Sequence, residues 1–133
     1  MNVWRVIPGL YVSGALTPSR SYLPEGITAI VDLEKKSGFD EYVQPGTLYL
    51  HWGISDGPAP ETMTARLVAL FVQLLAANGH RVLVHCGAGI NRSNLIIARA
   101  LMGWGLGADE AIAWVRRTRG TEALSNPHFG EHI

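Results

Sequence analysis

One segment of the sequence combines residue types that suit the binding of an anion. His85-Cys86-Gly87-Ala88-Gly89-Ile90-Asn91-Arg92-Ser93 follows a short apolar run and precedes a strongly apolar helical pattern. A glycine-rich turn between a strand and a helix can direct successive backbone N–H groups inward and form a cup for an anion. Gly87 and Gly89 permit the unusual dihedral angles that such a cup requires. The segment therefore predicts an anion-binding loop.

Two side chains of this loop suit chemistry on a bound phosphate. Arg92 carries a planar guanidinium fork that matches two phosphoryl oxygens. Cys86 would lie at the base of the cup, where the helix dipole and the loop amides stabilise a thiolate. A thiolate that faces a bound phosphate is positioned for in-line attack on phosphorus. We therefore interpret Cys86 as a nucleophile rather than as the small buried hydrophobe that a lone cysteine is by default.

The same residues resemble the signature loop of the cysteine-dependent protein tyrosine phosphatase superfamily. The pattern is Cys86, five residues and Arg92, with a histidine before it and a serine after it. The order of motifs, the short length and the loop from Trp52 to Asp56 are similar to the compact dual-specificity branch. Weaker similarity covers nearly the whole chain, from Ile7-Pro8-Gly9-Leu10-Tyr11-Val12-Ser13-Gly14 to Asn126-Pro127-His128-Phe129.

The resemblance implies a two-step hydrolysis. Cys86 would form a cysteinyl phosphate, and Asp56 would protonate the leaving oxygen and then deprotonate the attacking water. Asp32 and Asp40 compete with Asp56 for the role of the acid. The loop would bind the phosphate and stabilise the developing charge. Its phosphate-binding residues would be Gly87, Ala88, Gly89, Ile90, Asn91 and Arg92.

Three further residues match supporting positions of the resembled family. Ser93 would support the thiolate as a leaving group, His85 would hold the loop from behind, and Asn126 would brace the active-site loops. Ser93 and Asn126 also suit helix N-caps, and that alternative stays open. After the signature serine the family often has glycine, whereas this chain has Asn94.

The elements that must position these residues alternate between strand and helix. Short apolar runs predict strands, and they lie at Val3–Ile7, Leu10–Ser13, Ile27–Leu33, Thr47–His51 and Arg81–His85. Helical periodicity begins at Glu61, with one face formed by Met63, Leu67, Leu70, Phe71, Leu74, Leu75 and Asn78. Pro60 suits the first turn of this helix and Gly79 the residue past its end. Further helices are predicted over Ser93–Trp104, over Asp109–Arg119 and, as a short start, near Asn126-Pro127.

This order predicts the α/β class: a single domain with a central, mostly parallel twisted sheet flanked by helices. We expect residues 1–133 to form one dual-specificity or tyrosine phosphatase catalytic domain. A helical turn is possible near Asp40, and Arg116, Arg117 and Arg119 are interpreted as a solvated helix face.

Composition removes several classes of function. The 133 residues are 47% hydrophobic and 17% charged, which argues against intrinsic disorder. Eleven basic and eleven acidic residues balance, so no net field favours nucleic acid or an anionic membrane. A single cysteine excludes an intramolecular disulfide and a multi-cysteine zinc site. With neither a signal peptide nor a membrane span in the pattern, we expect a cytoplasmic monomer that needs no metal and no cofactor.

The predicted activity is hydrolysis of phosphotyrosine, and also of phosphoserine and phosphothreonine, in a phosphorylated protein substrate. Phosphate, sulfate or vanadate would occupy the loop as ligands. One alternative is a pseudophosphatase module that binds phosphate without turnover, and others are phosphatases of RNA 5′ ends or of phosphoinositides. Between Cys86 and Arg92 the loop has no lysine or arginine, which disfavours phosphoinositides, and zero net charge gives RNA no support.

Overall fold

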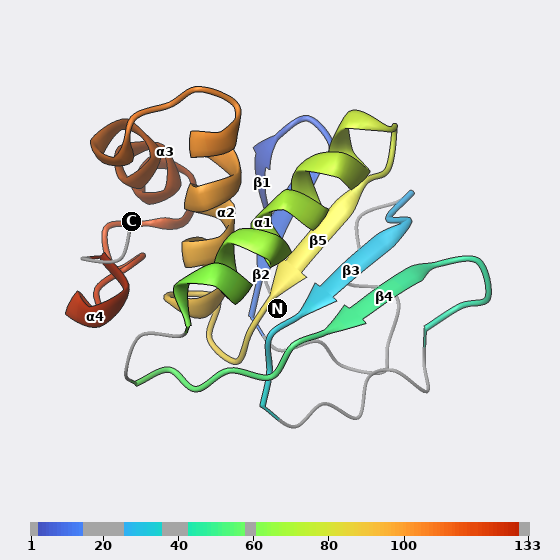
Figure 1. Cartoon of the computed structure of the whole chain (residues 1–133), viewed down its shortest axis with the longest axis horizontal. Helices are drawn as coiled ribbons and strands as arrows, with labels where there is room; N and C mark the ends of the chain where they lie inside the picture. Colours follow the sequence, from blue (N-terminus) through green and yellow to red (C-terminus); the bar gives the residue numbers. More distant parts are fainter. Residues whose placement is uncertain (1–2, 15–25, 36–42, 58–60, 131–133) are drawn as a thin grey trace.

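Five strands form one sheet, and the helices pack against it (Figure 1). The computed structural model describes residues 3–14, 26–35, 43–57 and 61–130. Its strands are β1 (Val3–Ile7), β2 (Leu10–Ser13), β3 (Ala29–Asp32), β4 (Leu48–His51) and β5 (Val82–His85). Its helices are α1 (Thr62–Ala77), α2 (Arg92–Gly103), α3 (Ala108–Arg119) and α4 (Pro127–Gly130).

The sheet is mixed, with the order β1-β2-β5-β3-β4. Strand β5 lies at the centre and runs parallel to β2 and β3, β4 runs parallel to β3, and only β1 is antiparallel. The predicted fold class, a mostly parallel α/β sheet, is confirmed. Asp32 pairs with both His51 and His85 in the strand register, so the carboxyl ends of β3, β4 and β5 meet at one edge. The loop that follows β5 starts at this edge.

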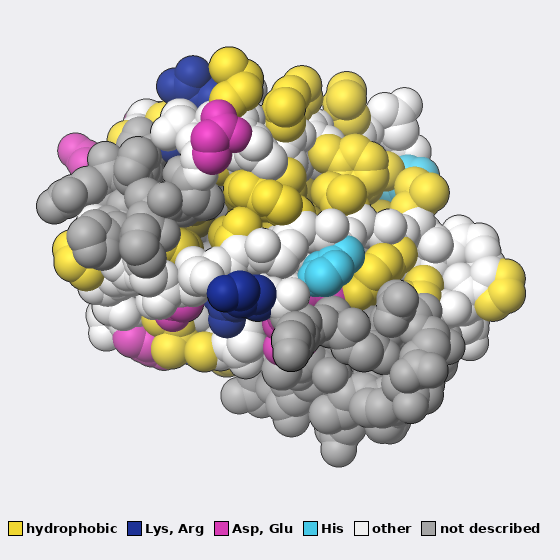
Figure 2. All heavy atoms as spheres, turned by 60° about the horizontal axis from the view of Figure 1, so that its bottom comes forward, with side chains coloured by type: hydrophobic (Ala, Val, Ile, Leu, Met, Phe, Trp, Pro, Cys, Tyr) yellow, Lys and Arg dark blue, Asp and Glu magenta, His cyan; other side chains and the backbone are white. Residues whose placement is uncertain are grey.

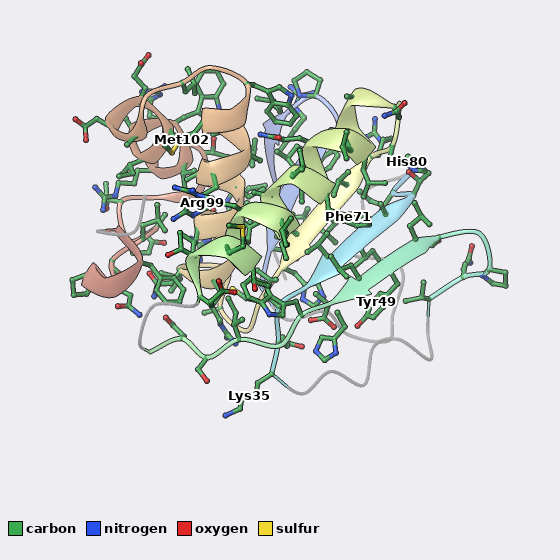
Figure 3. All side chains as sticks on the ribbon, in the orientation of Figure 1. Lys35, Tyr49, Phe71, His80, Arg99 and Met102 are labelled. Atoms are coloured by element: carbon green, nitrogen blue, oxygen red, sulfur yellow. The ribbon has the colours of Figure 1, made fainter. Side chains whose placement is uncertain are left out.

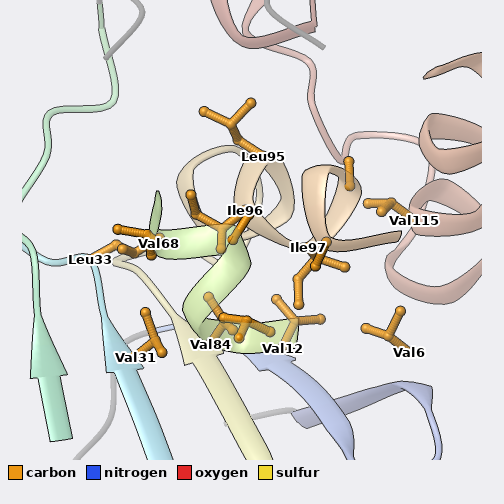
Figure 4. Close-up of a cluster of buried hydrophobic side chains, with 14 of the residues drawn as sticks. Val6, Val12, Val31, Leu33, Val68, Val84, Leu95, Ile96, Ile97 and Val115 are labelled. Atoms are coloured by element: carbon orange, nitrogen blue, oxygen red, sulfur yellow. The ribbon is translucent and has the colours of Figure 1, made fainter. Parts of the chain in front are cut away.

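The core lies between the sheet and the helices (Figure 4). Val12, Val31 and Val84 come from three adjacent strands; Val12 and Val84 lie beneath Ile97 of α2, and Val31 lies beneath Val68 of α1. Helix α2 is apolar on nearly every side, as predicted, and Leu95, Ile96 and Ile97 are fully buried. Each such side chain contributes roughly 1.5–3 kcal/mol on burial. This packing holds the amino-terminal end of α2, and hence Arg92 and Ser93, in place.

Helix α1 is confirmed, but its buried face shares only Leu75 and the half-buried Phe71 with the face that periodicity selected. The residues that pack inward are Ala65, Val68, Ala69, Val72 and Leu75. Met63, Leu67, Leu70 and Leu74 are 47–58% exposed instead. Small side chains bring α1 close to α2 and to the sheet, whereas the pattern weighted the largest apolar residues. Helix α1 therefore has two apolar faces.

The ends of α1 follow ordinary capping chemistry. Glu61 caps its start, where the carboxylate accepts the N–H groups of Met63 and Thr64 at 3.1 Å. Gly79 follows its end with φ +86°, and the His80 N–H reaches the Leu75 carbonyl at 3.0 Å. The predicted roles of Pro60 and of a turn near Asp40 lie outside the described residues.

Helices α3 and α4 complete the described fold. Ala111 and Val115 of α3 are buried as predicted, and the indole of Trp114 donates to the Val6 carbonyl of β1 at 3.0 Å. Helix α4 starts directly after Asn126, where a short helix was predicted. None of the helices in the described ranges has the length and apolar character that crossing a membrane requires.

Candidate active site

Cys86 is the first residue after the central strand. Its N–H donates to the Ser13 carbonyl of β2 at 3.4 Å, which continues the parallel pairing by one residue. Its Sγ accepts the Gly89 N–H at 3.3 Å and lies 3.3 Å from the Ser93 hydroxyl. The residue is 1% exposed, whereas Gly87 and Ala88 directly after it are exposed. The sulfur therefore lies at the floor of the loop, beneath an open rim.

Side chains from outside the loop bind its carbonyl oxygens. The Arg119 guanidinium donates to the Gly89 carbonyl at 2.8 Å and to the Ala88 carbonyl at 3.3 Å. The Asn94 amide donates to the carbonyls of Gly89 and Ile90 at 3.0 and 2.9 Å. These bonds hold three consecutive carbonyl groups away from the sulfur.

The orientation of those carbonyls fixes the orientation of the amides. In a planar trans peptide the C=O and the following N–H point in opposite directions. With the carbonyls of Ala88, Gly89 and Ile90 bound on the outside, the N–H groups of Gly89, Ile90 and Asn91 are turned toward the sulfur side. The bond from the Gly89 N–H to Sγ is the direct sign of this orientation. The loop therefore has the donor arrangement of an anion nest.

The two loop glycines are required for different reasons. Gly89 has φ +69°, and a Cβ there would lie 2.8 Å from backbone atoms of Ser13 and Gly14. Gly87 does not adopt a positive φ, so the prediction of an unusual dihedral angle is wrong for this residue. Glycine is required at position 87 for lack of space, because a Cβ there would lie 2.8 Å from Nη2 of Arg92. That close approach seats the guanidinium against the loop.

Asp56 is brought to the loop by two asparagines. Its Oδ2 accepts the side-chain amide of Asn91 at 3.1 Å, and its Oδ1 accepts that of Asn126 at 3.1 Å. The Asn126 amide also donates to the Gly57 carbonyl at 3.0 Å, and its backbone N–H donates to Asn91 Oδ1 at 3.0 Å. Asp56 itself is exposed. Its carboxylate is thus fixed at the rim rather than at the floor.

Arg92 joins the same two segments. Its Nη1 donates to the Ile54 carbonyl at 3.0 Å, so the first residue of α2 is tied to the segment that carries Asp56. Sequence reasoning assigned Asn91 only a backbone role in phosphate binding. The position of its side chain was missed, because a contact across 35 residues leaves no local pattern.

A buried polar network lies behind the loop. His85 Nε2 lies 3.3 Å from Asp32 Oδ1, and both residues are fully buried. Asp32 also accepts the Glu34 N–H at 3.0 Å and the hydroxyl of Tyr49, which lies on β4 (Figure 3). Burial lowers the pKa of His85 to about 4, against the opposing effect of Asp32, so the imidazole is neutral near pH 7.

The position of Asp32 in this network bears on two roles, catalytic acid and metal ligand. The residue competed with Asp56 as the acid, but its complete burial at the end of β3 keeps it away from the rim; Asp40, the other competitor, lies outside the described residues. Asp32, Glu34 and His85 are also the described residues whose possible metal-ligand atoms lie within 4.8 Å of one another. Burial and the nearby Asp32 raise the pKa of Glu34. Asp32 accepts two of the hydrogen bonds of this cluster, which belongs to the buried polar network behind the loop.

The alternative assignments of Ser93 and Asn126 as mere caps do not hold. The N-cap residue of α2 is Asn91, which makes no side-chain cap, and Ser93 is fully buried with its hydroxyl facing Sγ. Asn126 precedes α4, and its carbonyl accepts the Phe129 N–H at 3.0 Å. Its side chain binds the Asp56 segment, as described above.

The interpretation of three arginines as a solvated face is wrong for Arg119. Besides the loop carbonyls, its guanidinium lies 4.0 Å from the Trp4 ring centroid and 2.6 Å from the Glu122 carboxylate. Arg116 and Arg117 are exposed, although Arg116 also donates to the Ala123 carbonyl at 3.0 Å. A long flexible side chain on an amphipathic helix gives no sequence sign of which partner it reaches.

Comparison with known proteins identifies the family. A family model described as "Polymorphic toxin system, DSP-PTPase phosphatase" matches residues 11–106. The chain belongs to this phosphatase family. The resemblance to the dual-specificity branch is therefore confirmed, and this phosphatase is an enzyme of the protein-tyrosine and dual-specificity type.

Solved structures agree with the fold of the phosphatase. Tk-PTP in its active form is 24% identical, with a TM-score of 0.83, covering 98% of this chain and 92% of the other. A variant of human DUSP28 is 25% identical, with a TM-score of 0.84 and coverages of 98% and 90%. A mouse putative dual specificity phosphatase complexed with zinc tungstate is 22% identical, with a TM-score of 0.78 and coverages of 98% and 85%. No curated protein sequence matches the chain.

Proposed function

We propose that this phosphatase hydrolyses phosphotyrosine in proteins, and also phosphoserine and phosphothreonine, through a cysteinyl phosphate on Cys86. The observation that carries the proposal is the position of Sγ, 3.3 Å from both the Gly89 amide nitrogen and the Ser93 hydroxyl. A negative sulfur and a tetrahedral oxyanion would share the same set of amide donors. As one unit, residues 1–133 would form the catalytic domain.

In the first step, Sγ attacks phosphorus and the ester oxygen leaves. Loop amides and Arg92 stabilise the charge that develops on the three equatorial oxygens. Asp56 donates the proton that the leaving oxygen needs. Its fixed position at the rim supports this role, since the leaving group of a phosphate bound over Sγ points outward, toward the rim.

In the second step, water attacks the phosphocysteine. Asp56, now a carboxylate, accepts a proton from that water, and the sulfur leaves as a thiolate. The Ser93 hydroxyl donates to the departing sulfur and lowers the cost of its negative charge. His85 stays neutral behind the loop, so it supports the backbone without adding a cation beneath the sulfur.

The rim supports a protein substrate over the alternatives. Gly87 and Ala88 are exposed and carry no charge, and no lysine or arginine stands between Cys86 and Arg92. A polyanionic phosphoinositide or an RNA end would gain little attraction there. Tungstate, a tetrahedral oxyanion, accompanies the mouse relative, which supports phosphate, sulfate and vanadate as ligands of this loop.

The test is turnover by wild type, Cys86→Ser and Asp56→Ala. Wild type should release phosphate from p-nitrophenyl phosphate and from a phosphotyrosine peptide faster than from an RNA 5′ end or a phosphoinositide. Cys86→Ser should be inactive, and Asp56→Ala should accumulate a phosphocysteine that mass spectrometry detects. Phosphate binding without turnover by wild type would instead identify a pseudophosphatase module. The cytoplasmic location and the monomeric state stay predictions.

A further inference from the structure

The outer face of α1 carries a row of apolar side chains. Met63, Leu67, Leu70 and Leu74 are 58, 57, 47 and 55% exposed. Figure 2 shows hydrophobic side chains gathered in a band across the upper part of the molecular face that it draws. A helix on the surface of a globular protein usually presents polar residues to solvent, and a contiguous apolar patch marks an interaction site. We call these four residues the α1 seam.

The spacing of the α1 seam is that of a coiled coil. Its residues are separated by four, three and four positions, which matches the d, a, d and a positions of a heptad repeat. Such a seam fits a second helix packed alongside, because each side chain enters a hole between four side chains of the facing helix. The shape of the surface therefore points to a helical partner.

A cavity of about 380 Å³ opens beside the seam, between α1 and α2. Leu70 belongs to both features, and Arg66, Arg99 and Met102 also line the cavity. Figure 3 shows Arg99 and Met102 on α2, beside α1. Both charged residues that line the cavity are arginines; none of its lining residues in the described chain is acidic.

The cavity is a built feature of the helix pair. Gln73 of α1 donates to the Ala100 carbonyl of α2 at 2.9 Å, which cross-links the two helices at the cavity wall. Gly103 leaves the room for it, because a Cβ at that position would overlap the Gln73 amide. Burial, and then the charge of Arg66, lower the pKa of Arg99. Arg66 and Arg99 thus line one site, where each cation disfavours the charged form of the other.

The charged residues near the α1 seam indicate whether its partner is a second copy of this chain or a different protein. Helix α1 contains one arginine and no acidic residue between Thr62 and Ala77. Pairing two copies of the α1 seam would bring Arg66 and Arg99 of both copies together without a carboxylate from α1. Arg66 directly precedes Leu67, at a flanking position that pairs with opposite charge on the partner helix of a coiled coil. The complementary partner is therefore acidic.

We propose that the α1 seam and the adjoining cavity bind an amphipathic helix of a partner protein. Its apolar side chains pack on the α1 seam, and a glutamate or aspartate enters the cavity between Arg66 and Arg99. A carboxylate there accepts charge-assisted hydrogen bonds from both guanidinium groups. The proposal concerns a surface separate from the Cys86 loop and does not depend on the proposed function.

The experiment uses a designed helical peptide with leucine at the a and d positions and glutamate at the flanking positions. Its binding to the full chain is followed by fluorescence polarisation, beside a matched peptide with lysine in place of glutamate. The glutamate peptide should bind, and the lysine peptide should not. Arg66→Glu and Leu67→Ser should each weaken binding about tenfold, the effect of losing one charge-assisted pair or one buried leucine. Arg117→Glu, an exposed charge reversal on α3, should leave binding unchanged.

Activity and self-association provide the remaining controls. Turnover of p-nitrophenyl phosphate and the melting temperature of Arg66→Glu should equal those of wild type, because Arg66 is exposed. Equal binding of both peptides, no binding of either, or equal affinity for wild type and Arg66→Glu would overturn the proposal. A wild-type dimer in sedimentation that Leu67→Ser dissociates would overturn it as well, since the occupant would then be a second copy.

Discussion

Replacement of Arg119 by methionine tests whether carbonyls held on the outside of the loop keep its amides in position. The substitution removes the donors to the Gly89 carbonyl at 2.8 Å and to the Ala88 carbonyl at 3.3 Å. Methionine keeps the apolar stem of the side chain but lacks the guanidinium group that lies over the Trp4 ring. Gly89 keeps one donor from Asn94 at 3.0 Å.

The expected loss of stability follows from the two hydrogen bonds that Arg119 donates to the loop carbonyls. A hydrogen bond from a charged donor contributes roughly 1.5–3 kcal/mol, and the longer contact to Ala88 belongs at or below the lower end. The Arg119 side chain is 11% exposed, so solvent screening is modest. The exposed ion pair with Glu122 adds little. We expect the free energy of unfolding to fall by about 3 kcal/mol, which leaves a folded protein.

The assays are urea denaturation, vanadate affinity and turnover. Arg119→Met should lose the stated stability, bind vanadate about tenfold more weakly and lose kcat/KM for p-nitrophenyl phosphate by a similar factor. Arg117→Met on the same helix is the matched control, with a change within about 0.5 kcal/mol and no effect on vanadate. Equal stability and equal vanadate affinity of the two variants would refute the role of the outer carbonyl contacts.

Three further predictions concern the chemistry and the buried network. Asp56→Asn should lower kcat for a phosphotyrosine peptide by about 10²–10⁴, the usual range for a lost general acid, measured by phosphate release. Ser93→Ala should turn steady release into a burst in stopped-flow absorbance, because the phosphocysteine of Cys86 breaks down more slowly. The pKa of His85 is about 4 in the folded chain and 6.5 in the unfolded chain. Between pH 6.5 and pH 4, therefore, the imidazole takes up a proton in the unfolded chain but stays neutral in the folded chain. Stability should be unaffected by this group above pH 6.5 and should fall by roughly 3 kcal/mol as the pH drops toward 4, measured by denaturation at each pH.

A different result would contradict each of these three predictions. An Asp56→Asn enzyme with wild-type kcat would assign the proton to another group. Single-exponential kinetics without a burst in Ser93→Ala would remove the hydroxyl from the second step. An imidazole resonance of His85 that titrates near pH 6.5 in the folded chain, measured by NMR, would contradict the effect of burial.

The sequence was sufficient where function depends on neighbouring residues. The loop from His85 to Ser93 is local, so glycine positions, the buried sulfur and the following helix could be inferred from one segment. Strands β2 and β5 were visible as apolar runs, because parallel strands at the centre of a sheet are buried on both faces. Their order in the sheet is a result of the structure alone.

The sequence was insufficient where contacts are long-range or where side-chain size competes with periodicity. Arg119 and Asn91 reach partners about 30 positions away, and nothing in an amphipathic pattern marks such a reach. In α1 the helical period was predicted correctly, but most of the predicted inner face is exposed, because small residues such as Val68 and Val72 let the helix pack closer than Leu67 or Leu74 would. The exposed leucines that caused the error are the ones that form the α1 seam.

The near-complete burial of Cys86 should make its reaction with thiol reagents depend on the size of the reagent. With 1% of the residue accessible and the rim exposed at Gly87 and Ala88, we expect the rate of modification to fall as the size of the reagent increases. Hydrogen peroxide or iodoacetate should modify the sulfur rapidly, and excess vanadate should protect it. A bulky maleimide should react only when the chain unfolds, so the rate of maleimide labelling would report opening of the fold in a protein with no other thiol.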